Sequence, residues 1–506
     1  MHVLMLGWEF PPFITGGLGT ACFGLTKAMD RRGMRVTFVV PKSVRGECAE
    51  HVTLLSPDSY VPPVSNGESD LASGMDANPA AGAVRWITIP KGKSEAVRGH
   101  TPALTEGERK FSQVQFVQVP AGFSNPYTPA GDEVGHWSMT ESKPGASAAH
   151  HGSEAVASSQ ALQASSSGGQ PAGPHTGGSA HQGGHGGIVG VDYSGDIVSQ
   201  AERYAHFCLA ATRHIKFDMI HAHDWMTYPA GLLIARASGK PLVAHIHSTE
   251  FDRSGEHVNQ RIYDIERRGM HGAMRVIAVS QLTKNLVVRR YGVPEQRVEV
   301  VYNGVDLEPG QVGIAGIESR DKIVLYFGRI TYQKGPEYFI QAAKRVLEVM
   351  PDVKFVVAGS GDQAKNMIEM AANLGIGHKV LFTGFLRGND IKKVFSLADL
   401  YVMPSVSEPF GIAPLEAMSH NVPALISRSS GVSEVLSHVL KVDFWDIDDM
   451  ANKIIAVLKY PPLSQTLKEH GAFEVRRLTW DGAAERCEQV YHAVMREMTA
   501  HAVVPA

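Results

Sequence analysis

The sequence predicts an α/β protein with two Rossmann-like domains that face each other across a cleft. Short apolar strands alternate with helical patterns in two blocks, residues 1–310 and 311–475, which is typical of parallel sheets covered by helices. Polar and glycine-rich stretches follow several strands, at the sheet edge where such folds bind ligands. The 506 residues are enough for two or three domains, each with a core of its own.

Composition and charge exclude several classes of protein. With 43% hydrophobic residues, 20% charged residues and a net charge of −3, the chain does not resemble a nucleic-acid-binding protein. No apolar run reaches the roughly 18 residues of a membrane span, and the first residues lack the pattern of a signal peptide. The four cysteines are scattered, without the spacing of a metal site. We therefore expect a cytoplasmic protein with no transmembrane segment; its residues give no indication of an oligomeric state.

The first block begins as a strand, a loop, a helix and a second strand, which is how a doubly wound domain opens. Strands and helices then continue to alternate up to a connecting run at 298–306. The expected strands cover residues 2–6, 34–40, 84–89, 114–119, 217–221, 241–246 and 275–279. The expected helices lie near residues 19–32, 192–214 and 280–290, with one more after residue 225.

A glycine-rich loop follows the first strand. It contains G-L-G-T-A-C at residues 17–22, which is part of a dinucleotide-binding fingerprint. The third glycine of that fingerprint is replaced by Cys22, and a long loop with two prolines separates the glycines from the strand, so a dehydrogenase is disfavoured. Gly16, Gly17 and Gly19 form either a flexible turn or a set of backbone N–H groups that approach a diphosphate.

Two segments depart from the globular pattern, near residues 57–82 and 128–190. They are rich in Gly, Ser, Ala, Pro and His and have almost no apolar periodicity, so they cannot bury enough surface to offset the entropy of ordering. A histidine-rich tract can bind metal, but this one lacks cysteine or acidic spacing. We therefore interpret both segments as low-complexity, disordered insertions on the surface.

Two strand ends carry a concentration of ionisable side chains. H-A-H-D-W occupies residues 221–225, and H-I-H-S-T-E-F-D follows at 245–252. Residues two apart on a strand share a side, so His221 lies with His223 and His245 with His247. Three interpretations remain open: a metal site, hydrogen-bonded histidines at buried strand ends, and the polar edge of a binding cleft. The lack of a further ligand at helical spacing disfavours the metal site.

The second block begins near Lys322 and again alternates strand and helix. Its first strand is followed by Arg329 and Lys334, a basic pair that marks either a solvated helix start or an anion site. D-I-D-D at 446–449 contains D-x-D, a pattern that can hold metal, but its place before an apolar-periodic segment favours a helix N-cap. The other expected elements are a helix ending at 350, strands 353–358, 380–383 and 400–403, helices 363–374 and 389–395, and terminal helices within 476–506.

The stretch M-P-S-V-S-E-P-F-G-I-A-P-L-E-A-M at 403–418 concentrates the chemistry of this block. Proline and glycine between Glu408 and Glu416 exclude one continuous helix, so Glu408 lies on a loop and Glu416 in the first turn of a helix near Pro414. The helix start offers free backbone N–H groups for phosphate, and the carboxylates can accept from sugar hydroxyls. A nucleotide sugar carries both kinds of group.

P-S-V-S-E-P-F-G together with P-L-E-A-M resembles the donor-site signature of retaining GT-B glycosyltransferases of family 4. The resemblance implies that Glu408 contacts the transferred sugar and that Glu416 binds the ribose. It also implies that backbone N–H groups of Phe410, Gly411 and Ile412 help to hold the sugar.

Further stretches of the second block resemble the same family. F-G-R-I-T-Y-Q-K-G is similar to the family's diphosphate clamp, which implies that role for Arg329 and Lys334. G-S-G-D, beginning at Gly359, resembles a further donor loop. V-Y-N-G-V-D resembles the connector between the domains and makes Asn303 a candidate for the cleft. The resemblance also implies that the last helix packs back on the first domain.

The first block resembles glycogen and starch synthases. I-T-G-G-L is similar to their K-T-G-G-L loop, which implies donor binding by Gly16 and Gly17, although Ile14 stands where they carry lysine. H-A-H-D-W and the histidine that follows are similar to their catalytic cleft. This resemblance implies that His247 lies against the donor sugar, with Asp224 as its neighbour.

The resemblance implies a retaining enzyme that moves a sugar, expected to be glucose, from a nucleoside-diphosphate sugar to a hydroxyl acceptor, such as a glycogen-type α-glucan. Stabilising the leaving group should dominate catalysis, because departure of the diphosphate develops negative charge on its oxygens. No metal and no cofactor is expected, since the nucleotide sugar is a substrate. Two alternatives are a nucleotide-sugar epimerase and a non-catalytic sugar-binding module of the same fold. The expected catalytic residues are His247, Glu408, Arg329 and Lys334.

Overall fold

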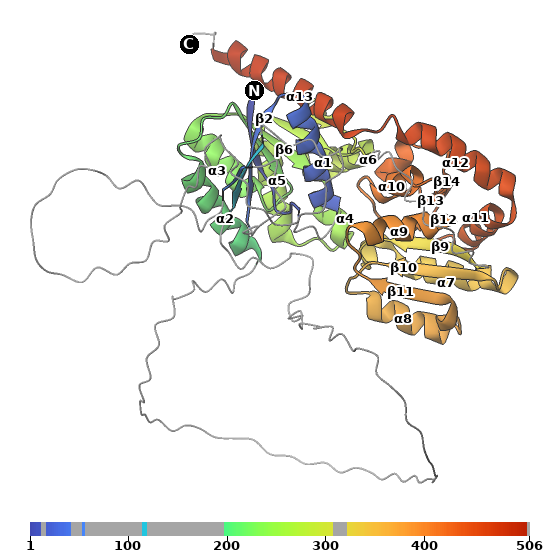
Figure 1. Cartoon of the computed structure of the whole chain (residues 1–506). Helices are drawn as coiled ribbons and strands as arrows, with labels where there is room; N and C mark the ends of the chain where they lie inside the picture. The colour runs from blue at the N-terminus through green and yellow to red at the C-terminus, as the bar shows by residue number, and fades with distance from the viewer. Residues whose placement is uncertain (12–16, 42–52, 56–113, 119–196, 307–320, 503–506) are drawn as a thin grey trace, which may run out of the picture. The chain divides into compact units, whose positions relative to one another are not determined.

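The computed structural model of the chain describes residues 1–11, 17–41, 53–55, 114–118, 197–306 and 321–502 (Figure 1). Within these residues the strands form two separate sheets, one of eight strands and one of six. We call the part built on the first sheet the N-terminal domain and the part built on the second sheet the C-terminal domain. The predicted fold class, α/β with two Rossmann-like domains, is confirmed.

The N-terminal sheet has the strand order β3-β4-β2-β1-β5-β6-β7-β8, and its neighbouring strands are parallel. Parallel neighbours need crossover connections, which place helices on the faces of the sheet. The strands are β1 (His2–Leu6), β2 (Arg35–Val40), β3 (Thr53–Leu55), β4 (Val114–Gln118), β5 (Met219–His223), β6 (Leu242–Ile246), β7 (Arg275–Ala278) and β8 (Val298–Val300).

Helices cover both faces of this sheet because apolar side chains leave its strands in both directions. Leu4 and Ile220 belong to one core, whereas Val3 and Phe38 belong to the core on the other face. The first core is closed by α2 (Ile197–Thr212), α3 (Tyr228–Ser238), α5 (Gln260–Gly272) and α6 (Gln281–Tyr291). The second is closed by α1 (Gly17–Arg31) and α13 (Trp480–Ala502).

The C-terminal sheet has the order β11-β10-β9-β12-β13-β14 and is also parallel. Its strands are β9 (Lys322–Phe327), β10 (Val353–Ala358), β11 (Val380–Gly384), β12 (Leu400–Met403), β13 (Ala424–Ser427) and β14 (Leu440–Val442). Its helices are α7 (Pro336–Val349), α8 (Ala364–Asn373), α9 (Asn389–Leu397), α10 (Ala413–Ser419), α11 (Ile447–Lys459) and α12 (Pro461–Val475). Asp446 caps α11 by accepting from the N–H of Asp449, so the D-x-D stretch has the structural role expected of it.

The last helix, α13, packs against α1 of the N-terminal domain (Figure 1). The two helices approach so closely that a Cβ atom at Gly24 would lie 2.2 Å from Cε2 of Trp480. Arg31 at the end of α1 forms an ion pair of 2.8 Å with Asp481. Burial of an aromatic side chain such as Trp480 stabilises a fold by about 2 kcal/mol or more. Helix α13 is therefore part of the N-terminal core.

Some predicted boundaries were wrong. The fifth strand covers 219–223 instead of 217–221, because its parallel pairing with β6 continues as far as His223 and His245. The predicted strand 84–89, the insertions 57–82 and 128–190, and the first residues of the helix predicted from 192 lie outside the described residues. Among the residues that the structure does describe, no helix is both long and apolar enough to span a membrane.

Candidate functional site

Polar side chains from both domains meet around a cavity of about 280 Å³. The residues that follow β1, β5 and β6 line its N-terminal side, and those that follow β9, β10 and β12 line its C-terminal side, as expected for parallel sheets. Gly16 lies outside the described residues. The other predicted site residues all line the cavity: Gly17, Asp224, His247, Asn303, Arg329, Lys334, Gly359, Glu408, Phe410, Gly411, Ile412 and Glu416.

Glu408 lies on the loop between β12 and α10, and backbone hydrogen bonds fix this loop. The N–H of Glu408 donates to the carbonyl of Ser429 at 3.0 Å, and the N–H of Gly431 donates to the carbonyl of Glu408 at 2.9 Å. A Cβ atom at Gly431 would lie only 2.2 Å from the carbonyl oxygen of Pro409. Glu408, which is 7% exposed, is therefore held at a defined place in the cavity wall.

Lys334 lies in the short 3-10 turn after β9, and its Nζ atom is 2.5 Å from Oε2 of Glu408. The hydroxyl of Ser405 donates to the same carboxylate oxygen at 3.3 Å. Both charged side chains are largely buried, so each needs the other as compensation. Arg329, which lies between β9 and this turn, also faces the cavity. The structure thus joins the predicted basic pair to the first predicted carboxylate.

Two glycines allow the backbone to line the cavity closely. Gly411 has a φ of +102°, a conformation that other residues rarely adopt, and it directs the chain into α10. Gly359 approaches the preceding βα loop so tightly that a Cβ atom would lie 1.8 Å from the carbonyl oxygen of Gly328.

Glu416 lies in the first turn of α10, as predicted. Burial raises the pKa of Glu416 to about 7.

On the N-terminal side, Asp224 follows β5 in a left-handed conformation with a φ of +60°, which is uncommon for residues other than glycine. Its Oδ1 atom accepts from the backbone N–H of His247 at 2.6 Å and from that of Ser248 at 3.4 Å. Burial raises the pKa of Asp224 to about 7, although these donors favour the charged form. Asp224 therefore fixes the turn that carries His247, and its strained backbone is of the kind found at functional sites.

Three family models match separate parts of the chain. Residues 2–69 match the model of the starch synthase catalytic domain, residues 173–309 that of Glycosyltransferase Family 4, and residues 311–472 that of Glycosyl transferases group 1. An uncharacterized glycosyltransferase of Methanocaldococcus jannaschii is 33% identical over 302 residues, which are 56% of this chain and 77% of the relative. The chain belongs to the GT-B glycosyltransferases.

A further relative and a solved structure are also similar to this glycosyltransferase. A D-inositol 3-phosphate glycosyltransferase of Pseudarthrobacter chlorophenolicus is 28% identical over 313 residues, 58% of this chain and 74% of the relative. The solved structure of a sucrose-phosphate synthase from Thermosynechococcus elongatus matches 98% of this chain and 100% of its own with a TM-score of 0.64 at 17% identity, which shows the shared fold. The recognition of a family-4-type GT-B glycosyltransferase with a starch-synthase-like N-terminal part is confirmed.

Four histidines of the glycosyltransferase pack together at the ends of β5 and β6. The rings of His221 and His223 stack with their centroids 4.3 Å apart, and those of His245 and His247 do so at 4.2 Å. Burial lowers the pKa of His221 and His247 to about 3 and also lowers the pKa of His223 and His245, so all four rings are neutral at physiological pH.

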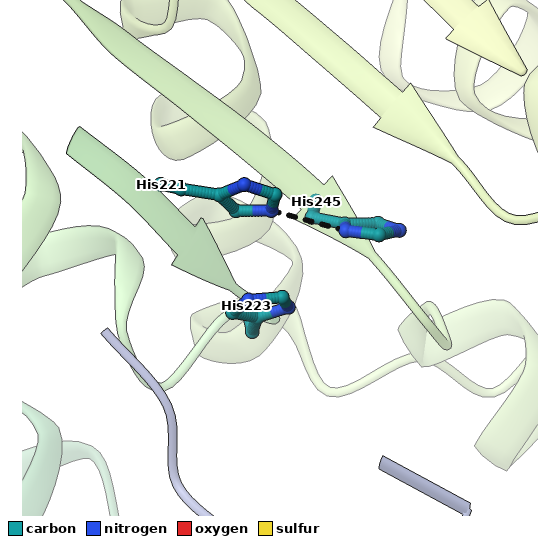
Figure 2. A group of neighbouring side chains, drawn as sticks. All are labelled: His221, His223 and His245. Carbon is teal, nitrogen blue, oxygen red and sulfur yellow. Dashed lines mark hydrogen bonds between the residues drawn. The ribbon is translucent and has the colours of Figure 1, made fainter. Parts of the chain in front are cut away.

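Nitrogen atoms of His221, His223 and His245 lie within 4.8 Å of one another, close enough to be considered as metal ligands (Figure 2). An imidazole binds metal in the plane of its ring, however, and the stacked rings of His221 and His223 differ by only 17°, so their lone pairs run side by side. Nε2 of His221 and Nδ1 of His245 share a hydrogen bond of 3.0 Å. This geometry favours hydrogen-bonded histidines over a metal site, whereas His247 borders the cavity.

The two domains of the glycosyltransferase are hydrogen-bonded to each other beside the cavity. The hydroxyl of Ser407 donates to Oδ1 of Asp252 at 2.7 Å. The hydroxyl of Ser280, the N-cap of α6, donates to the carbonyl oxygen of Pro409 at 2.6 Å. The loop that carries Glu408 is therefore held by both domains.

Sequence reasoning missed several polar residues that line the cavity. Glu9, which is 6% exposed, directly follows β1, and the rule that ligands bind where parallel strands end could have identified it. The same rule applies to Ser248, Ser360 and Ser405, which lie just past β6, β10 and β12, whereas Thr20 lies within α1 and has no such signal. Another depression, of about 630 Å³, lies beside Trp445 and Arg345 and includes none of the predicted site residues.

Proposed function

We propose that this glycosyltransferase transfers a hexosyl group, with glucose as the first candidate, from a nucleoside-diphosphate sugar to a hydroxyl acceptor, with retention at the anomeric carbon. The observation that carries the proposal is the convergence of two basic side chains and two carboxylates around one cavity: Arg329, Lys334, Glu408 and Glu416. Guanidinium and ammonium groups suit a diphosphate, and carboxylates suit the hydroxyls of ribose and hexose.

The basic side chains stabilise the leaving group in this proposal. Negative charge grows on the diphosphate as the glycosidic bond breaks, and cations placed beside it interact more strongly with the transition state than with the bound donor. Arg329 can contact two phosphate oxygens at once, whereas Lys334 acts as a point charge. Lys334 pairs with Glu408 at 2.5 Å, so the bound donor brings its diphosphate to a cation that already has a carboxylate beside it.

The remaining groups hold the two sugars of the donor. Glu416 accepts from ribose hydroxyls, and Glu408 accepts from hydroxyls of the transferred sugar. Backbone N–H groups of residues 410–412 and the side chain of His247 complete the contacts to the transferred sugar. The Gly17 loop and Asp224 border the same space from the N-terminal domain, where the acceptor hydroxyl must approach.

Two acceptor classes have specific support. The match of residues 2–69 to the starch synthase catalytic domain favours a glycogen-type α-glucan. The similarity to a D-inositol 3-phosphate glycosyltransferase favours a small phosphorylated polyol as the second candidate.

A screen for release of nucleoside diphosphate tests the proposal. The full chain is incubated with ADP-, UDP- and GDP-sugars, each without acceptor, with glycogen and with D-inositol 3-phosphate. We expect release by one donor to increase several-fold with one acceptor, and NMR of the product should show the anomeric configuration of the donor sugar. An inverted product would contradict retention. An epimerised donor without any acceptor would indicate an epimerase, and donor binding without turnover in every combination would indicate a binding module.

A further inference from the structure

We propose that His223 is a positioning residue for His247. A hydrogen bond between the two rings keeps His247 in the tautomer with its proton on Nδ1, and this N–H is then the group that His247 offers to the sugar in the cavity. The inference rests on the proposed function for its catalytic consequence, although the tautomer itself can be measured without any substrate.

The contact between the two rings is direct. Nδ1 of His223 and Nε2 of His247 are 2.9 Å apart, which is a normal hydrogen-bond distance. His223 is fully buried, and its ring stacks with those of His221 and Phe38, with centroid distances of 4.3 and 6.2 Å. A ring packed in this way cannot turn freely, so the side of His223 that meets His247 is fixed.

The environment of His223 determines which nitrogen carries its proton. Among the described residues, none hydrogen-bonds to the buried Nε2 atom of His223. A buried N–H without an acceptor is rarer in proteins than an acceptor without a donor. The neutral ring of His223 therefore carries its proton on Nδ1 and donates it to Nε2 of His247.

This donor sets the tautomer of His247 in turn. Because Nε2 of His247 accepts from His223, the proton of the neutral His247 ring must be on Nδ1. The backbone N–H of His247 is held separately by Asp224 at 2.6 Å. Ring and backbone of His247 are thus fixed by two consecutive residues at the end of β5, and Nδ1–H is the ring donor left for a ligand.

A second pair in the same cluster provides a comparison. Nε2 of His245 also lacks a partner among the described residues, so His245 donates through Nδ1 to Nε2 of His221 at 3.0 Å (Figure 2). Nδ1 of His221 in turn hydrogen-bonds to the hydroxyl of Tyr491 on α13, which is buried. This second chain of hydrogen bonds leads into the core, whereas the chain from His223 to His247 leads to the cavity.

Kinetics of matched variants test the positioning role. His223→Phe keeps a flat ring in the stack but removes the donor, and we expect it to lower kcat by about tenfold with a change in donor KM of about twofold or less. His223→Asn places an amide N–H near the former Nδ1 atom and should recover most of this loss. His221→Phe removes a histidine of equal burial that does not hydrogen-bond to His247, so it should lower thermal stability similarly but change kcat by about twofold or less.

Nitrogen NMR of the unsubstituted protein tests the tautomer directly, even where a variant fails to fold. With 15N-labelled histidine and His247→Gln as the reference for assignment, we expect the Nδ1 signal of His247 to be that of a protonated nitrogen and its Nε2 signal that of an unprotonated one. A protonated Nε2 on His247, or equal loss of kcat in His223→Phe, His223→Asn and His221→Phe, would overturn the inference.

The outcomes separate the inference from the proposed function. If turnover depends on His247 but not on His223, the inference fails and the proposed function stands. If no nucleotide sugar reacts, the proposed function fails, whereas the NMR measurement still decides how His223 and His247 are paired.

Discussion

The two sides of the cavity differ in how their polar groups are held. On the C-terminal side, opposite charges compensate each other, as Lys334 and Glu408 do at 2.5 Å. On the N-terminal side, the histidines are neutral and hold each other by stacking and hydrogen bonds. The cavity therefore offers a pair of opposite charges on the side proposed to bind a diphosphate, and neutral imidazoles beside the carboxyl groups of Glu9 and Asp224 on the other side. Substitutions of the charged residues on the C-terminal side should change how strongly the cavity stabilises the leaving diphosphate. Substitutions of the histidines on the N-terminal side should change the orientation of the groups that contact the sugar.

Removing positive charge from the C-terminal side should have the largest effect. We expect Arg329→Ala or Lys334→Ala to lower turnover by about a hundredfold or more, as loss of an oxyanion-type donor does. The double variant should lose less than the product of the two single losses, because both cations act on one diphosphate. Lys322→Ala is a matched control, since Lys322 pairs with Asp399 at 2.9 Å in the same domain and does not line the cavity.

The same assay tests whether side chains alone supply this charge. Release of nucleoside diphosphate should survive exhaustive chelation of divalent metal ions. An enzyme that loses its activity to a chelator and regains it with added metal, while both single variants keep nearly the full rate, would contradict the mechanism.

The two carboxylates on this side should separate turnover from affinity. Glu408→Gln should lower kcat more than donor affinity, because it removes a contact to the transferred sugar and the partner of Lys334. Glu416→Gln should weaken donor binding by roughly 1 to 3 kcal/mol, the value of a hydrogen bond to a charged group. Calorimetric titration with the donor and steady-state rates measure both quantities. Small and equal effects of the two substitutions on both constants would remove these roles.

Donor binding should depend on pH through Glu416. Because burial raises the pKa of Glu416 to about 7 and the carboxylate is the form that accepts from ribose, protons compete with the donor below this pH. The donor Kd should then rise by at most about tenfold per pH unit as the pH falls below 7. Titrations at several pH values should show this slope in the unsubstituted protein. Glu416→Gln should lack it, and an unchanged slope in the variant would assign the pH dependence to another group.

The same pKa shift has an opposite sign for folding. Because the pKa of folded Glu416 lies above its ordinary value of 4.5, its contribution to stability is fully present below pH 4.5 and is lost as the pH rises through 7. Thermal unfolding should therefore show that Glu416→Gln raises the midpoint more at pH 8 than at pH 5. An equal change at both pH values would show that the carboxyl is not buried in solution.

The smallest effect is expected for a substitution in the core of the N-terminal domain, away from the cavity. Tyr491→Phe removes the hydrogen bond to His221 and should lower the free energy of unfolding by about 1 kcal/mol, the net value of a typical buried hydrogen bond. Donor affinity and turnover should stay unchanged, because this bond leads away from the cavity. Urea unfolding and steady-state kinetics check the two statements. A kinetic loss without a loss of stability would show that the core histidines are coupled to the cavity.

The fold class and most of the C-terminal side could be predicted because their signals lie in short segments. Glu408 and Glu416 are eight residues apart, and Arg329 and Lys334 are five apart, so local patterns place each pair on one loop or helix start. The strand was predicted to end at residue 221, because the apolar run stops before His221. In the structure, pairing with β6 continues the strand as far as His223. The pattern of one strand contains no information about its partner.

Contacts between distant segments could not be predicted at all. Lys334 and Glu408 are 74 residues apart and meet because β9 and β12 are neighbours in one sheet. Asp252 and Ser407 are 155 residues apart and meet only because the two domains come together. The assignment of His247 came from resemblance, and the hydrogen bond that orients its ring depends on the packing of two neighbouring strands.

The position of α13 has a consequence for the biosynthesis of the chain. Trp480 and Tyr491 share a core with Val3 and Phe38, which leave the ribosome more than four hundred residues earlier. A nascent N-terminal domain therefore lacks one wall of its core until α13 has been synthesised. The C-terminal sheet and its helices come from residues 322–475 and are all synthesised before that wall. Vectorial synthesis thus favours the reverse of the usual order, in which the domain translated first is also the first to finish folding.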